Sequence, residues 1–216
     1  MTEEHRLTVH RSARYYTIGA TRSPGEVWVV LHGYGQLAAM FLEKFRALDD
    51  GRRLFVAPEA LSRFYVSERP SERRVGASWM TREDRLAEID DYLRYLDATL
   101  DDVCRSIGER SVNILGYSQG AATAARWAAL GNVRVDRLVL WGGEFPPDLD
   151  VGREPGRARL DAMDLTLVYG RSDELITPKV IDRMREQLRP HGLSFDEVPF
   201  DGGHELNEDV LHRLMA

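Results

Sequence analysis

Apolar residues in this chain occur in two kinds of stretch, which differ in length and spacing. Short continuous apolar runs bounded by glycine, proline or charged residues are typical of strands that are covered on both faces. Longer segments with apolar residues every three or four positions are typical of helices with one apolar face. The two kinds follow one another along the chain, which predicts a mostly parallel α/β sheet with helices on both faces. The predicted strands are residues 7–17, 26–31, 53–58, 112–115, 137–141, 165–169 and 193–200.

The longest predicted helix follows Thr81-Arg82-Glu83-Asp84, a sequence with the form of a capping box, and ends near Gly108. Shorter helices are expected at residues 38–48, in the alanine-rich stretch after Gly120, from Thr177-Pro178 onward, and at 208–215. Two segments, 59–80 and 144–164, show no periodic pattern, and long irregular segments in compact domains often carry function. The apolar face of the long helix is predicted to comprise Leu86, Ile89, Leu93, Leu96, Leu100, Val103 and Ile107.

Length and composition narrow the class of protein. A chain of 216 residues with 43% hydrophobic and 30% charged residues fits a single soluble domain spanning 1–216. No apolar run is long enough for a transmembrane helix, so we expect no stable membrane insertion. The N-terminus has no signal-peptide pattern and Cys104 is the only cysteine, so a cytoplasmic location is expected. A net charge of −6 argues against a nucleic-acid partner.

The segment Gly116-Tyr117-Ser118-Gln119-Gly120 joins a predicted buried strand to an alanine-rich helix. It fits the pattern G-x-S-x-G, in which a sharp strand-to-helix turn exposes a nucleophilic serine. Glycines are needed two positions before and after the serine because neighbouring chain approaches closely there. Ser118 is therefore the candidate nucleophile.

A serine nucleophile requires a general base and an acid, which follow it in the order Ser, acid, His in folds with this turn. His204 lies on a Gly-Gly loop directly after a predicted strand, and it is the favoured base among the six histidines. Asp173 follows the strand at 165–169 and is the favoured acid, with Glu174 as its nearest competitor. All these positions follow carboxyl ends of parallel strands, so Ser118, Asp173 and His204 are expected on one rim of the sheet.

Two backbone N–H groups are expected to stabilise an oxyanion at this rim. One belongs to Gln119, the residue after the nucleophile, and the other to Tyr34 in the loop His32-Gly33-Tyr34-Gly35 after the strand at 26–31. His32 is interpreted as a structural residue that forms hydrogen bonds within this loop.

A competing motif is present in the same loop. Residues 33–38 fit G-x-G-x-x-A, a dinucleotide-binding pattern, and Glu59 could serve as the ribose ligand. Two strands precede the motif, whereas the pattern normally follows the first strand. A nucleotide-binding oxidoreductase also leaves Ser118, Asp173 and His204 without a role.

Assembled, these motifs resemble the phospholipase/carboxylesterase family of α/β-hydrolases, which includes acyl-protein thioesterases. The resemblance covers the chain from about Trp28 onward and rests on five stretches: LHGYGQ, LFVAPEALSRFY, GYSQGAATAARWA, GRSDELITP and GGHEL. It implies an α/β-hydrolase fold without a large lid domain. It further implies a serine esterase that needs no metal or other cofactor, with Ser118, Asp173 and His204 as catalytic triad and Tyr34 and Gln119 as oxyanion donors.

The chain departs from the family where substrate preference is decided. Family members commonly carry Trp-Phe-Asp before the long helix, whereas this chain has Ser78-Trp79-Met80-Thr81. The segment 144–164 matches no family pattern. Residues expected to line the substrate pocket are Phe64, Trp79, Met80 and Trp141, each with ordinary packing as the alternative.

The resulting hypothesis is hydrolysis of a small-molecule carboxylic ester with a short to medium acyl chain, with lysophospholipids and thioesters as further substrates to consider. A hydrolase-fold receptor that binds a small ligand without turnover is an alternative from another class. An acyltransferase using the same triad is a third. An exposed apolar surface near the site would favour a homodimer.

Overall fold

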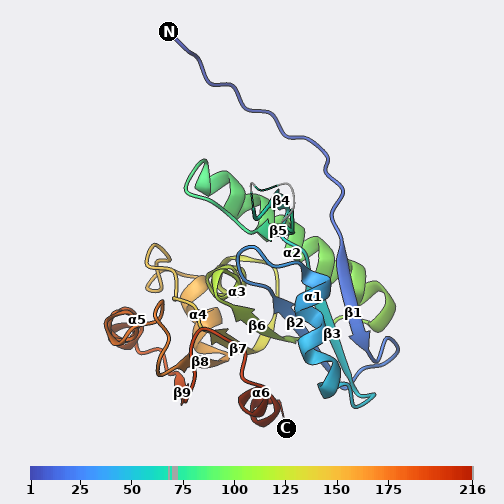
Figure 1. The fold of residues 1–216 in the computed structure, drawn as a ribbon, viewed down its shortest axis with the longest axis vertical. Coiled ribbons are helices and arrows are strands. Elements are labelled where there is room, and N and C mark those ends of the chain that lie inside the picture. Colours follow the sequence, from blue (N-terminus) through green and yellow to red (C-terminus); the bar gives the residue numbers. More distant parts are fainter. Residues whose placement is uncertain (68, 70–72, 216) are drawn as a thin grey trace.

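The computed structural model describes residues 1–67, 69 and 73–215. A seven-stranded sheet with the strand order β1-β3-β2-β6-β7-β8-β9 forms its centre (Figure 1). Neighbouring strands are parallel from β3 to β9, and only the edge strand β1 runs antiparallel, against β3. The strands are β1 (Tyr15–Gly19), β2 (Glu26–Leu31), β3 (Arg53–Pro58), β6 (Val112–Tyr117), β7 (Val135–Trp141), β8 (Asp164–Gly170) and β9 (Asp196–Phe200).

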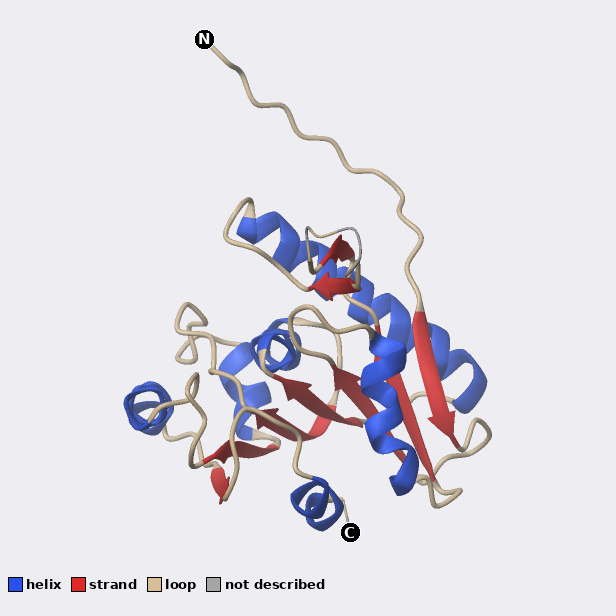
Figure 2. Ribbon diagram, in the orientation of Figure 1, coloured by secondary structure: helices blue, strands red, loops and turns tan. Residues whose placement is uncertain are grey.

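Helices cover both faces of this sheet, which confirms the predicted architecture (Figure 2). On one face, Val27, Val29 and Leu31 of β2 pack in a core with α2, α3, α4 and α5. On the other face, Trp28 and Val30 pack in a second core with α1, η1 and α6. The alternation follows from the strand geometry, which turns successive side chains to opposite faces. The helices are α1 (Ala38–Leu42), the 3₁₀ segment η1 (Glu43–Leu48), α2 (Arg85–Ile107), α3 (Gln119–Leu130), α4 (Gly156–Asp161), α5 (Pro178–Leu188), the 3₁₀ turn η3 (Arg189–His191) and α6 (Glu208–Leu214).

The first strand is shorter than predicted, because β1 begins at Tyr15 rather than at Leu7. The ladder with β3 pairs Tyr15 with Pro58, the last residue of β3, so the tail before Tyr15 has no strand beside it. Leu7 and Val9 are 83% and 70% exposed. Alternating apolar residues there did not suffice to make a strand without a partner.

The two segments read as irregular contain regular structure. Between β3 and α2, β4 (Ser62–Tyr65) and β5 (Val75–Ser78) pair antiparallel as a separate two-stranded sheet. In the second segment, α4 occupies Gly156–Asp161. Both elements are too short to produce a recognisable period in the sequence.

The capping box predicted at Thr81–Asp84 is wrong. Helix α2 begins at Arg85, and Asp84 at its N-terminus has a left-handed backbone with φ 45°. Thr81 hydrogen-bonds Glu88 instead, through both its backbone N–H and its hydroxyl. Leu86 lies off the apolar face and is 71% exposed, while Gly108 ends the helix as predicted.

Other predictions agree with the structure. β9, with Pro199, is an edge strand, as the proline indicated. The α5 helix starts with Pro178 after Thr177. In the described part of the chain, no helix is long and apolar enough to cross a membrane.

Candidate active site

The turn at Ser118 has the close contacts that its two glycines imply. Ser118 has φ 54° and ψ −118°, a conformation that side chains disfavour. A Cβ on Gly116 would lie 2.2 Å from the backbone oxygen of Gly120, and a Cβ on Gly120 would lie 2.3 Å from that of Leu31. The backbone therefore folds β6 tightly against α3 and β2 and leaves the serine side chain at the end of the strand.

Ser118, His204 and Asp173 come together at the carboxyl ends of the strands. Ser118 lies between β6 and α3, Asp173 follows β8 and His204 follows β9. The His204 Nε2 is 3.0 Å from the Ser118 hydroxyl oxygen, and Nδ1 is 2.8 Å from Asp173 Oδ2. A carboxylate only accepts hydrogen bonds, so Nδ1 carries the proton and Nε2 is free to accept the serine proton. The three residues form the hydrogen-bonded chain that nucleophilic catalysis by serine requires.

Asp173 is held in a single orientation by the backbone around it. It is 6% exposed, and its Oδ1 accepts the N–H groups of Leu175 at 2.8 Å and Ile176 at 3.1 Å. Its other oxygen is thereby directed to His204. The neighbouring Glu174, the alternative acid from the sequence, is exposed.

Two aromatic side chains anchor the loop that carries His204. The Tyr117 hydroxyl donates to the backbone oxygen of His204 at 2.8 Å, and Trp141 Nε1 donates to that of Glu205 at 2.8 Å. Burial raises the pKa of Tyr117 to about 12, so its hydroxyl remains a donor at neutral pH. Gly170 allows the same loop to approach β8, since a Cβ there would lie 2.3 Å from the Gly203 oxygen. The sequence indicated neither anchor, because both join residues far apart in the chain.

The loop with Tyr34 is fixed by hydrogen bonds at both ends. His32 is fully buried; its Nδ1 donates to the Gly33 oxygen at 2.8 Å and its Nε2 accepts from Ala60 N at 3.1 Å. Burial lowers the pKa of His32, which keeps the ring neutral, as these two bonds require. The structural role predicted for His32 is thus confirmed. Across the loop, Gly35 N donates to Ala77 O at 2.9 Å.

The two N–H groups expected to face an oxyanion are free to do so. Within residues 1–67, 69 and 73–215, the Tyr34 N–H has no hydrogen-bond acceptor. Gln119 is the first residue of α3, where an N–H has no partner inside the helix and the helix dipole favours negative charge.

The Gln119 side chain has a second function that the sequence did not reveal. Its Oε1 accepts from Trp79 N at 3.0 Å and its Nε2 donates to Met80 O at 2.8 Å. The residue after the nucleophile therefore ties the segment between β5 and α2 to the start of α3. Only the spatial neighbourhood of that segment identifies the contact.

The residues predicted to line a substrate pocket divide into two groups. Phe64 and Met80 are partly exposed, and the Phe64 ring lies 5.1 Å from the ring of Tyr34. Trp79 and Trp141 are 2% and 0% exposed, and their indole N–H groups donate to the backbone oxygens of His32 and Glu205. The burial of these two tryptophans favours the packing alternative, in which they anchor loops; a substrate contact by either stays a prediction.

Glu59, the residue that would bind the ribose in the alternative dinucleotide site, is not accessible. Glu59 is 2% exposed and accepts from Arg14 at 2.7 Å and Arg63 at 3.2 Å. Both bonds reach Oε1, and Oε2 is buried, so the carboxylate is not accessible to a ribose hydroxyl.

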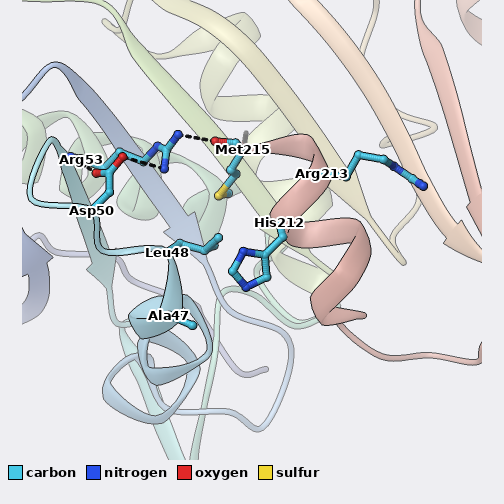
Figure 3. A pocket seen from close by; sticks show the side chains of 7 residues that line it. All are labelled: Ala47, Leu48, Asp50, Arg53, His212, Arg213 and Met215. Carbon is cyan, nitrogen blue, oxygen red and sulfur yellow. Dashed lines mark hydrogen bonds and ion pairs between the residues drawn. The ribbon is translucent and has the colours of Figure 1, made fainter.

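A surface cavity of about 390 Å³ lies elsewhere, between η1 and the end of α6 (Figure 3). Arg53 at the first position of β3 donates to the Met215 oxygen beside it. Because β3 begins there, the cavity lies near the amino ends of the parallel strands, whereas Ser118 lies at their carboxyl ends. Its lining residues are Ala47, Leu48, Asp50, Arg53, His212, Arg213 and Met215.

The chain is similar to known proteins in sequence and in fold. Residues 28–163, more than half of the chain, match the model of the family described as alpha/beta hydrolase fold. Among solved structures, the chain is similar to acyl-protein thioesterase 2 of Zea mays, with 18% identity, TM-score 0.73 and coverage of 94% of this chain and 96% of that one. It is similar to a carboxylesterase from Mesorhizobium loti (19%, TM-score 0.73, 94% of each chain) and to the esterase PE8 (21%, TM-score 0.70, 95% and 97%).

Proposed function

Because the chain belongs to the α/β-hydrolase fold family, we propose that it is a serine esterase that hydrolyses carboxylic esters through Ser118, His204 and Asp173. The observation that carries the proposal is the hydrogen-bonded chain from the Ser118 hydroxyl through His204 to Asp173, at 3.0 and 2.8 Å. The similarity to a carboxylesterase, an esterase and an acyl-protein thioesterase supports a hydrolase of this type.

The reaction follows from the positions of these groups. The Ser118 oxygen attacks the ester carbonyl while His204 Nε2 takes its proton, and the imidazolium is stabilised by Asp173. The N–H groups of Tyr34 and Gln119 stabilise the oxyanion of the tetrahedral intermediate. His204 then protonates the departing alcohol, and a water molecule activated by the same ring releases the acid.

The proposed substrate class is based on the small amount of chain that is available to cover the site. Among the described residues between β3 and α2 the regular structure is the short β4–β5 hairpin, and no large lid domain is inserted there. We therefore propose small esters with short to medium acyl chains, with lysophospholipids or thioesters as substrates of the same chemistry. Such a site needs no residue from a second copy, so it would work in a monomer or in each subunit of a homodimer.

The test combines labelling with turnover. A fluorophosphonate should label the intact protein at Ser118, and nitrophenyl esters of short or medium acids should be hydrolysed. Ser118→Ala and His204→Ala should each lower kcat by several orders of magnitude. Paired oxygen esters and thioesters of equal chain length then separate the two bond types. A protein that neither labels nor turns over these esters refutes the proposal, and tight binding without turnover would favour a receptor.

A further inference from the structure

A cluster of two arginines and one aspartate lies beside the proposed site. Arg126 of α3 donates from Nη2 to Asp148 Oδ1 at 2.6 Å, and Arg85 at the start of α2 donates to Asp148 Oδ2 at 2.5 Å. Burial is the largest single influence and raises the pKa of Asp148, but the hydrogen bonds from Arg126 and Arg85 and the charge of Arg126 together outweigh it, so the pKa of this carboxyl group is lowered. One carboxylate therefore forms ion pairs with two guanidinium groups, so the three residues together have a net charge of +1.

The buried part of this cluster has hydrogen-bond donors that remain unused. Arg126 is 3% exposed, yet within the described residues its Nε forms no hydrogen bond of normal geometry. The buried hydroxyl of Tyr92 interacts with the Arg126 guanidinium group but has no acceptor among these residues for its own proton. Arg126 Nη1 contacts the sulfur of Met80 at 3.8 Å, and a thioether is a weak acceptor. Burial raises the pKa of Tyr92, so this hydroxyl is a donor as well. Buried donors of this kind usually have an acceptor, and charged ones in particular.

The cluster lies in line with the proposed nucleophile. Residues three and four apart share a face of a helix, so Gln119, Ala122 and Arg126 follow one another along α3. Ser118, Gln119 and Ala122 are partly exposed, so this line is accessible as far as Ala122, whereas Arg126 is buried and contacts the Met80 sulfur. Met80 lies along it, with its backbone oxygen on Gln119 and its sulfur on Arg126. Seven residues of helix separate Gln119 from Arg126 by about 10 Å.

We propose that Arg126, together with Arg85 and Tyr92, binds a carboxylate at the far end of the acyl chain, so that the preferred substrates are monoesters of medium-length dicarboxylic acids. This inference rests on the proposed esterase function and specifies its substrate class. The carboxylate accepts from Arg126 Nε and the Tyr92 hydroxyl, and it supplies the missing negative charge. A planar carboxylate suits the fork of a guanidinium group.

Met80 must move for the carboxylate to reach Arg126. Its side chain is unbranched and adapts to different surroundings at low cost. Asp148 remains in place and holds both arginines, so it orients the cluster and repels a carboxylate placed on the wrong side. Medium chain length follows from the 10 Å of helix between Gln119 and Arg126, since shorter acids would leave their carboxylate unpaired near Ala122.

The experiment compares monomethyl esters of dicarboxylic acids with methyl esters of monocarboxylic acids of equal chain length, from succinate to sebacate. The intact protein should favour the acid-bearing ester by about tenfold or more in kcat/KM at one medium length, because charge-assisted hydrogen bonds discriminate at this level. In Arg126→Met the ratio between the two esters should fall to about one. The matched control is Arg94→Met, which removes an exposed arginine of α2 that pairs with Asp91, and it should keep the ratio.

A second measurement uses the unaltered protein, in case Arg126→Met does not fold. Free medium-length dicarboxylates should inhibit turnover of a neutral nitrophenyl ester competitively, about tenfold more strongly than monocarboxylates. A ratio near one at every chain length, or a preference retained in Arg126→Met, overturns the inference, although turnover of neutral esters still supports the esterase. If no ester is turned over, the proposed function fails, and calorimetry with the dicarboxylates decides the carboxylate site separately: absence of binding overturns it.

Discussion

The strained backbone at Ser118 predicts that glycine at this position gives a more stable protein than alanine, the reverse of the usual order. Ser118→Ala and Ser118→Gly remove the same hydroxyl group, so they differ only by the Cβ at a residue with φ 54° and ψ −118°. A side chain held in a sparsely populated region costs about 1–3 kcal/mol. Glycine avoids this cost but loses about 0.5–1 kcal/mol through the greater freedom of the unfolded chain. Ser118→Gly should therefore be more stable than Ser118→Ala by about 1 kcal/mol.

The assay is urea unfolding of both variants, with the midpoint and slope fitted together. For a chain of this size, a difference of 1 kcal/mol also shifts Tm by about 2–4 °C. The matched control is Ala122→Gly, one turn further along α3, which should destabilise by about 0.5–1 kcal/mol as glycine does in an ordinary helix. If Ser118→Gly were less stable than Ser118→Ala by a similar margin, the strain at the turn would be refuted.

Three further predictions concern the structure around the site. Tyr117→Phe removes the bond to the His204 oxygen and should lower kcat and the rate of fluorophosphonate labelling together by about tenfold, with KM little changed; equal labelling rates would show that this bond does not position His204. The pKa of His32 lies below 6.5, so the unfolded chain binds a proton that the folded chain does not. Stability should therefore fall as pH drops from about 6.5, at up to about 1.4 kcal/mol per pH unit, and urea titrations of His32→Gln should lack this part of the slope. Gly120→Ala places a Cβ 2.3 Å from Leu31 O and should destabilise by about 1–3 kcal/mol in urea unfolding, whereas an unchanged midpoint would contradict the close approach of α3 to β2.

Several elements of the site could be predicted because their signals are local. The mostly apolar runs at 26–31, 53–58 and 112–115 indicate strands that are buried on both faces. The two glycines around Ser118 report a close approach of the backbone. His204 and Asp173 could be selected because each follows a strand, and the carboxyl ends of parallel strands share one rim.

Other features could not be predicted because they depend on partners that are distant in sequence. The segment 59–80, which shows no periodic pattern in the sequence, contains both Trp79, which is buried, and Met80, which is partly exposed. The capping box failed because Thr81 found a better partner in Glu88, one that the pattern does not include. The strand expected at 7–17 failed in its first half because an alternating pattern forms a strand only beside another strand.

The sequence by itself determined the α/β architecture, the sharp turn at Ser118 and the small group of residues that could act with it. These follow from side-chain period, glycine sterics and position after a strand, which all act over a few residues. The tertiary structure alone decided that His204 lies 3.0 Å from Ser118 and that Gln119 holds the segment before α2. It also decided that Arg126 lies beneath Met80 with unused donors. These contacts join elements whose proximity is set by strand order, and no local pattern of the chain encodes that order.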